Sequence, residues 1–136
     1  MFSSEKYNET QPMYEIIIGG WNNEQSSIRK CRQQSWTVAT NHTPLSEYDY
    51  QSFWITWLSN STQTGLTIRV GIGVIEFVNQ LLFLHDSYPC NINYIGISTG
   101  DESGGTWIFL VGKLNGSNVL IEAYCVSVTA SKIRKS

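Results

Sequence analysis

The chain has little charge and no broad excess of basic residues. Lys, Arg, Asp and Glu make up 15% of its 136 residues and leave a formal net charge of −2, whereas a typical soluble domain carries about 25% charged residues. We therefore expect no cationic surface of the kind that binds nucleic acid. The short basic tail, residues 131–136, is expected to be a solvated terminus.

The sequence also lacks long apolar runs. No stretch approaches the ~18 apolar residues of a membrane span, so we expect no membrane insertion. Residues 1–12 are polar, lack the apolar region of a signal peptide and are expected to form an N-terminal arm. This favours a cytosolic protein or one exported without a leader, and it leaves secretion open if a signal has been removed. Asn-x-Ser/Thr sequences at Asn8, Asn41, Asn60 and Asn115 support secretion only weakly and leave glycosylation open.

Cysteine and histidine are sparse as well. The three cysteines, Cys31, Cys90 and Cys125, cannot all pair within one chain and show no Cys-x-x-Cys spacing. We expect free thiols, and whether any two form a disulfide stays open. The two histidines, His42 and His85, form no cluster with cysteine. We therefore expect no metal site and no cofactor.

What the sequence has in abundance is apolar alternation with a period of two. This pattern, rich in β-branched and aromatic residues, is typical of β-strands separated here by Asn- and Gly-containing turns. We expect an all-β protein with one domain over residues 13–130, an antiparallel β-sandwich of the jelly-roll type. Helix is expected only as a turn around residues 46–51. The residues expected in the core are Ile16, Ile18, Phe53, Ile55, Ile68, Val70, Ile95, Ile97 and Phe109.

Aromatic and glycine-rich blocks follow one another in a set order along the chain. They are Tyr-Glu-Ile-Ile-Ile-Gly-Gly-Trp at 14–21, Ser-Ile-Arg at 27–29, Phe-Trp-Ile-Thr-Trp at 53–57, Ile-Arg-Val-Gly-Ile-Gly at 68–73, Asp86 with Pro89, and Ile-Gly-Ile-Ser-Thr-Gly at 95–100 leading to Trp107. This ordered set resembles the farnesoic acid O-methyltransferase-like domain of arthropod and other invertebrate proteins, over roughly three quarters of the chain. The name of that family implies methyl transfer.

The residues themselves do not favour methyl transfer. The nearest approach to a cofactor-binding glycine turn is Gly71-Ile72-Gly73, but the third glycine of the fingerprint would fall at Glu76. Residues 74–78 are predicted to form a strand, and Gly19-Gly20-Trp21 is not expected to open a helix. We interpret these glycines as structural, because glycine allows a strand to bend or turn. We therefore expect neither S-adenosylmethionine binding nor catalysis. His85 and Asp86, adjacent on a strand, are expected to point to opposite faces and cannot form a dyad.

Loop residues fit glycan binding better. Sugar recognition combines flat aromatic rings with planar amide, carboxylate and guanidinium groups that fix hydroxyls. Because the loops of a sandwich gather at its two ends, we expect a ligand site at one end, with Trp21 as the stacking ring and Tyr88 in the cluster around His85. For Asp86 the alternative is a buried carboxylate that accepts backbone N–H groups. The predicted ligand-binding residues are Trp21, Asn22, Asn23, Arg29, His85, Asp86, Asp101 and Glu102.

The sequence therefore predicts a lectin without enzymatic activity that recognises glycans, with galactose-type ligands as one class. A small-molecule methyltransferase and a protein-interaction module are the alternatives. A single shallow sugar site binds weakly, and joining several sites raises avidity. We therefore expect a homodimer or homotetramer that forms through residues 119–128, which are largely apolar on both faces of a strand.

Overall fold

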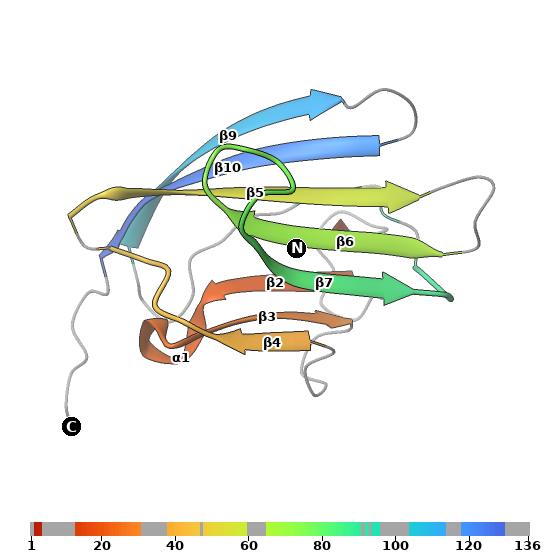
Figure 1. The fold of residues 1–136 in the computed structure, drawn as a ribbon, viewed down its shortest axis with the longest axis horizontal. Coiled ribbons are helices and arrows are strands. Elements are labelled where there is room, and N and C mark those ends of the chain that lie inside the picture. The colour runs from red at the N-terminus through yellow and green to blue at the C-terminus, as the bar shows by residue number, and fades with distance from the viewer. Residues whose placement is uncertain are drawn as a thin grey trace.

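The computed structural model describes residues 2–3, 13–30, 38–46, 48–59, 65–90, 92, 94–95, 104–113 and 118–129. The strands within these ranges form two antiparallel five-stranded sheets (Figure 1). The first sheet, in the order β4-β3-β2-β1-β8, contains β1 (Phe2–Ser3), β2 (Met13–Gly19), β3 (Gln25–Lys30), β4 (Val38–Asn41) and β8 (Tyr94–Ile95). The second, in the order β7-β6-β5-β10-β9, contains β5 (Tyr50–Ser59), β6 (Leu66–Ile72), β7 (Gln80–Asp86), β9 (Gly104–Lys113) and β10 (Asn118–Thr129).

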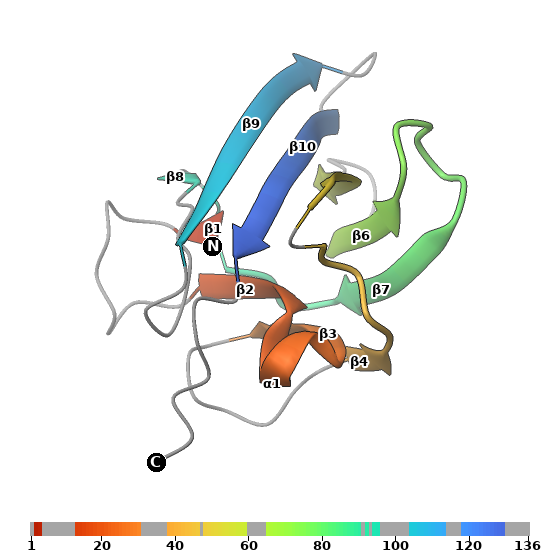
Figure 2. The same ribbon diagram turned by 90° about the vertical axis from the view of Figure 1, so that its left-hand side faces the viewer.

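The two sheets pack against each other across a shared core, and Figure 2 shows them turned by 90° from Figure 1. In the second sheet, β5, β6 and β7 follow one another and β10 returns to lie beside β5, which is a Greek-key order. The first sheet repeats this arrangement, with β8 returning to lie beside β1. The all-β antiparallel sandwich expected from the period-two pattern is confirmed. Phe2–Ser3 pair with both β2 and β8, so part of the expected N-terminal arm belongs to the sheet.

The core lies between the sheets, where alternate residues of β5, β6 and β7 meet those of β2 and β3. Of the residues expected there, Phe53, Ile55, Ile68 and Val70 are buried. Ile16 and Ile18 are only partly buried, although both pack against the core. The burial of Ile95, Ile97 and Phe109 lies outside what the structure describes. The buried residues of the cluster are Tyr14, Ile28, Ile55, Trp57, Leu66, Ile68, Val70, Leu82 and Leu84.

The outer face of β5 is also covered, because the segment between β6 and β7 folds over it. Trp54 is fully buried there, and its indole Nε1 donates a hydrogen bond to the carbonyl oxygen of Val78 at 2.9 Å. A Cβ at Gly71 would lie 2.2 Å from the Trp54 ring, so the missing side chain makes room for the indole. The expected strand over 74–78 is wrong: residues 73–79 form turns, because anchoring on Trp54 replaces pairing in the sheet.

The expected helical turn at 46–51 is also wrong. The Ser46 hydroxyl oxygen accepts hydrogen bonds from the N–H groups of Tyr48 and Asp49, which bends the chain directly into β5. A single helical turn, α1 (Gly20–Asn23), occurs instead between β2 and β3. Within it Trp21, Asn22 and Asn23 have φ between 52° and 64°, a left-handed conformation that is costly for residues other than glycine. This turn therefore does not provide the N-terminus of a regular right-handed helix.

The last two strands pair antiparallel, and the position of β10 limits how copies of the chain associate. β10 pairs with β9 along one edge and with β5 along the other. Both edges of β10 are therefore occupied within the sheet, so it cannot extend the sheet into a second copy. Contact through the face of this strand remains open, because its side chains lie outside what the structure describes.

Candidate functional site

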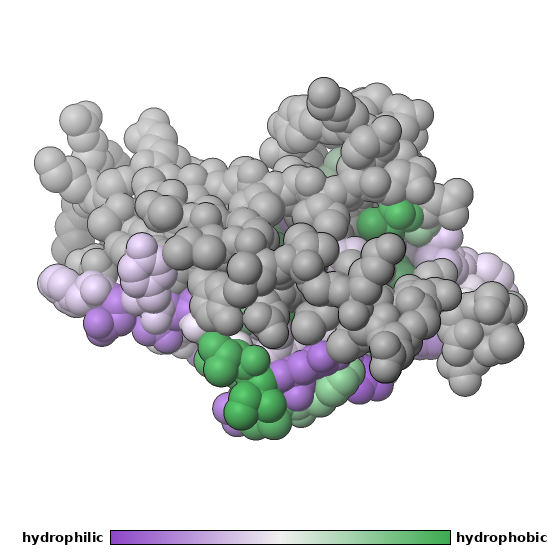
Figure 3. Space-filling model, turned by 90° about the horizontal axis from the view of Figure 1, so that it is seen from above, coloured by the Kyte–Doolittle hydropathy of each residue, from purple (hydrophilic) through white to green (hydrophobic). Residues whose placement is uncertain are grey.

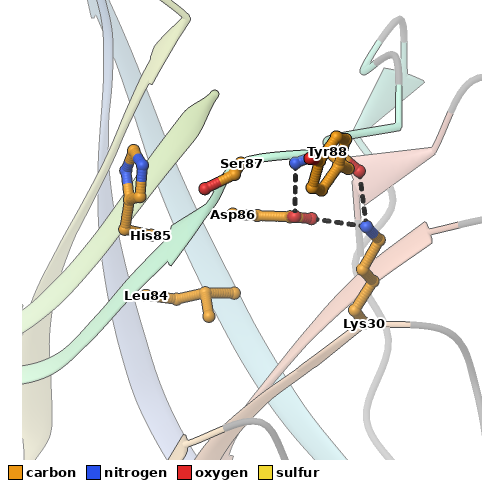
Figure 4. A pocket seen from close by; sticks show the side chains of 6 residues that line it. All are labelled: Lys30, Leu84, His85, Asp86, Ser87 and Tyr88. Carbon is orange, nitrogen blue, oxygen red and sulfur yellow. Dashed lines mark hydrogen bonds and ion pairs between the residues drawn. The ribbon is translucent and has the colours of Figure 1, made fainter. Parts of the chain in front are cut away.

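One end of the sandwich is closed by a polar contact that joins the two sheets. Tyr14 on β2 and Lys30 on β3 are cross-strand partners, and Asp86 ends β7 in the other sheet. The Asp86 carboxylate accepts hydrogen bonds from the Tyr14 hydroxyl, from Lys30 Nζ at 2.7 Å and from the Tyr88 N–H at 3.0 Å. Lys30 Nζ also donates to the Tyr88 carbonyl oxygen at 2.6 Å (Figure 4). We call Tyr14, Lys30 and Asp86 the polar clamp.

The clamp shifts the acidity of its members. Burial raises the pKa of Asp86, but the hydrogen bonds from Lys30, Tyr14 and the Tyr88 N–H, with the charge of Lys30, outweigh burial and hold it below 3.8. Burial raises the pKa of Tyr14 far above its usual value, and the hydrogen bond to Asp86 and the nearby Cys90 thiol raise it further. Asp86 is therefore ionised and Tyr14 neutral at neutral pH, which gives a fixed acceptor beside a fixed donor.

A half-open depression of about 300 Å³ lies over the clamp. The Tyr88 ring at its rim is 87% exposed. His85 points away from Asp86 (Figure 4), and its Nδ1 lies 3.0 Å from the Thr67 hydroxyl on β6. The expectation that the side chains of adjacent His85 and Asp86 point to opposite faces of the strand is confirmed. The residues that line the depression are Lys30, Leu84, His85, Asp86, Ser87 and Tyr88.

The opposite end of the β2–β3 hairpin carries the strained turn α1. Trp21 is 43% exposed there, and the Asn23 side chain both accepts from the Leu45 N–H at 3.0 Å and donates to the Leu45 carbonyl at 2.8 Å. Below the turn, the buried Ser26 hydroxyl accepts from the Gly19 N–H at 3.1 Å and lies 2.6 Å from His42 Nε2. Burial lowers the pKa of His42. The polar groups here hold the turn in place.

The sequence-predicted site residues therefore do not gather at one end. Trp21, Asn22 and Asn23 precede β3, whereas Lys30 ends it, so the two clusters are separated by about 16 Å along that strand. The expected convergence is wrong for these two clusters, because β3 runs the length of the sandwich between them. His85 and Asp86 do line one depression. Asp101 and Glu102 lie outside the described residues.

Arg29 belongs to neither cluster. Its guanidinium forms an ion pair with Glu15, its direct cross-strand partner on β2. Because side chains alternate along a strand, Arg29 and the adjacent Lys30 leave β3 on opposite faces. Lys30 faces the other sheet and reaches Asp86 there, whereas Arg29 is turned away from the depression.

The sequence did not identify two of the residues that build the site. In the sequence, Tyr14 has the pattern of an ordinary core residue of the first strand, and Lys30 is an isolated charged residue. Tyr14 and Asp86 are 72 residues apart, and no spacing rule connects them. The alternative considered for Asp86, a buried carboxylate that accepts backbone N–H groups, agrees with its bond to Tyr88.

The described part of the chain offers few other sites. Within it, no three His, Cys, Asp or Glu side chains gather as a metal ion would require. Cys90 is a free, half-buried thiol, as expected, whereas Cys31 and the side chain of Cys125 lie outside the described residues. Among the described elements, no helix has the length and apolar character needed to cross a membrane.

The fold and this depression define an antiparallel β-sandwich domain with an open polar site and an aromatic rim at one end. The chain belongs to the farnesoic acid O-methyl transferase family, whose family model matches residues 1–111. The resemblance seen in the ordered aromatic and glycine blocks is thereby confirmed. No curated protein and no solved structure matches the chain.

Proposed function

We propose that the domain is a carbohydrate-binding module, a lectin without catalysis, and that its ligand site is the depression over the polar clamp. The observation that carries this proposal is the Tyr88 ring, 87% exposed, beside a carboxylate that three donors hold in place. An exposed ring next to pre-oriented polar groups suits a ligand with one apolar face and several hydroxyls.

The chemistry of the clamp supports binding more than proton transfer. A carboxylate has about four acceptor positions, and three described donors reach Asp86, which leaves capacity for a sugar hydroxyl. His85 and Ser87 provide further hydroxyl-binding groups along the wall. A general acid or base works best with a pKa near the operating pH, whereas the pKa of Asp86 is lowered and that of Tyr14 is raised.

The methyltransferase alternative rests on the family description. The glycine-containing segment nearest to a cofactor turn has a structural explanation, since Gly71 accommodates the Trp54 indole and Gly73 has a φ of 100° in the following turn. A protein-interaction module remains the second alternative. We retain homo-oligomer formation as part of the lectin proposal, because several linked sites raise the avidity of a weak one by ~10²–10⁴.

A glycan array with purified protein, covering galactose-, mannose- and N-acetylglucosamine-terminated glycans, tests the proposal. Tyr88→Ala should weaken binding about tenfold to a hundredfold, because loss of a stacking ring costs ~1–3 kcal/mol. Trp21→Ala is the matched control: it removes another exposed aromatic ring at the other end of β3 and should leave the affinity unchanged.

The outcomes separate the alternatives. If Trp21→Ala abolished binding and Tyr88→Ala did not, the glycan site would lie at the α1 end, where the sequence had placed its stacking residue. If no glycan bound while calorimetry showed micromolar affinity for S-adenosylmethionine, the enzyme alternative would replace the lectin.

A further inference from the structure

An exposed apolar patch lies on the second sheet, around the connection between β6 and β7. It consists of the turn segment 73–79, which we call the apolar loop, together with Phe83 on β7. Figure 3 shows apolar surface gathered on a projection of the molecule, with hydrophilic surface beside it. The large apolar side chains of the patch are each 45–63% exposed, and they are Val74, Ile75, Phe77, Val78 and Phe83.

The apolar loop is held in one conformation by its anchors. Its ends are joined by the hydrogen bond from the Ile72 N–H to the Asn79 carbonyl at 3.1 Å, and the Gly73 N–H donates to the Ser52 carbonyl at 2.8 Å. Phe77 packs edge-on against Trp54, with ring centroids 5.8 Å apart. The loop therefore presents its apolar side chains from a well-anchored base.

This conformation carries backbone strain. Phe77 and Asn79 have φ of 62° and 53°, and a positive φ is costly for a bulky residue such as phenylalanine. A turn without positive φ values at these residues would be sufficient to connect β6 and β7. Strain that is retained in an exposed apolar segment points to a role for the exposed side chains themselves.

We infer that the patch is the interface through which a second copy of this chain docks, across a two-fold axis. The five exposed side chains present on the order of 500 Å², at the upper end of the largest apolar patch on a typical monomer. A two-fold axis buries the same patch on both copies, which gives about 1,000 Å² in total. That area reaches the lower limit for a specific interface.

The polar residues around the patch also favour a second copy. Arg69 on β6 lies over the rings of Phe77 and Phe83, with its guanidinium carbon 5.5 and 5.3 Å from their centroids. Arginine flanked by aromatic rings is the composition of binding hot spots. The loop also carries Glu76, but this residue is partly buried, with one carboxylate oxygen inside the protein. Arg69 is a single basic residue, whereas an anionic lipid surface attracts clusters of basic residues, so the patch fits a protein surface better than a lipid surface.

Sedimentation velocity on the full chain tests this inference. The wild type should show twice the 15.4 kDa monomer mass at tens of micromolar. Ile75→Asp should raise the dissociation constant at least about a hundredfold, because a dimer places two unmatched carboxylates in an apolar contact. Ile75 is 63% exposed and has an ordinary φ, so the variant should keep its fold by circular dichroism.

Tyr88→Asp is the matched control. It adds the same charge at a more exposed residue beyond the opposite end of β7, a strand about 20 Å long that begins next to the apolar loop. This variant should dimerise like the wild type while losing glycan binding, and Ile75→Asp should keep the intrinsic affinity for a monovalent sugar. The two proposals therefore fail independently.

Three results would overturn the inference. The first is a wild type that stays monomeric at tens of micromolar. The second is a dimer that Ile75→Asp leaves intact, which would mean that the interface lies elsewhere, for example on the face of β10. The third is a monomer that floats with phosphatidylcholine vesicles through the loop, which would make its partner a lipid surface.

Discussion

Asp86→Asn should destabilise the domain by about 2–3 kcal/mol, because Asp86 connects the two sheets. The substitution keeps the size of the side chain, removes its charge and replaces one acceptor oxygen by an N–H donor. The Asp86 side chain is only 14% exposed, and its carboxylate accepts from Tyr14 on β2 and Lys30 on β3. Those donors would lose a charged acceptor.

The magnitude follows from the burial of each donor. A hydrogen bond to a charged group contributes about 1.5–3 kcal/mol, and a buried donor left unsatisfied costs about 1–3 kcal/mol. Tyr14 is fully buried and cannot turn to water, so its hydroxyl should account for most of the loss. The Lys30 side chain is 34% exposed, so its contribution is reduced by solvent screening.

Urea unfolding as a function of pH is the appropriate assay. The pKa of Asp86 is lowered in the folded protein, so its contribution is complete above the ordinary value of 3.8 and is lost as the pH falls through the folded pKa. The stability difference between wild type and Asp86→Asn should therefore be constant from about pH 5 upward and shrink below that.

A double-mutant cycle with Tyr14→Phe identifies the partner. If the Tyr14–Asp86 hydrogen bond joins the sheets, the two substitutions should be non-additive by about 1 kcal/mol or more. Asp86→Asn within about 0.5 kcal/mol of the wild type, or strict additivity with Tyr14→Phe, would refute the clamp as a stabilising contact.

Two further predictions concern Gly71 and His42. Gly71→Ala should lower the free energy of unfolding in urea by about 2–3 kcal/mol, because its Cβ would lie 2.2 Å from the buried Trp54 ring. Gly73→Ala has no atom within 4 Å of its Cβ and should cost only the strain of its φ of 100°, about 1 kcal/mol. A larger loss for Gly73→Ala than for Gly71→Ala would contradict this packing. Burial lowers the pKa of His42 below 6.5, so the folded protein should lose stability as the pH falls below that value. His42→Gln should flatten the pH dependence between about pH 5 and 7, and an NMR titration of His42 at or above 6.5 would rule this explanation out.

The local structure of the described sheets could largely be predicted from the sequence. Alternation of apolar residues depends only on which side of a strand each residue faces, and that relation is local. The burial of Phe53 and Ile55, both on β5, was predicted correctly for this reason. The ordered aromatic and glycine blocks likewise identified the family that the match over residues 1–111 confirms.

Segment 73–79 shows the limit of that reasoning. Its apolar residues suggest a strand, yet Trp54, about 20 positions earlier, holds it as a turn through a hydrogen bond to Val78. A local apolar pattern indicates that a segment packs against other apolar residues. It does not indicate whether that contact is a neighbouring strand or the outer face of another.

Only the tertiary structure decided where the site lies. The sequence marked His85 and Asp86 as polar residues near a strand end, and Trp21 to Asn23 as a polar turn, but not which of them share an end. The direction and register of β2 and β3 place Tyr14 and Lys30 beside Asp86 and carry Trp21 to the far end. Partners 72 residues apart meet because two sheets pack face to face, and the period of a strand contains no information about which faces meet.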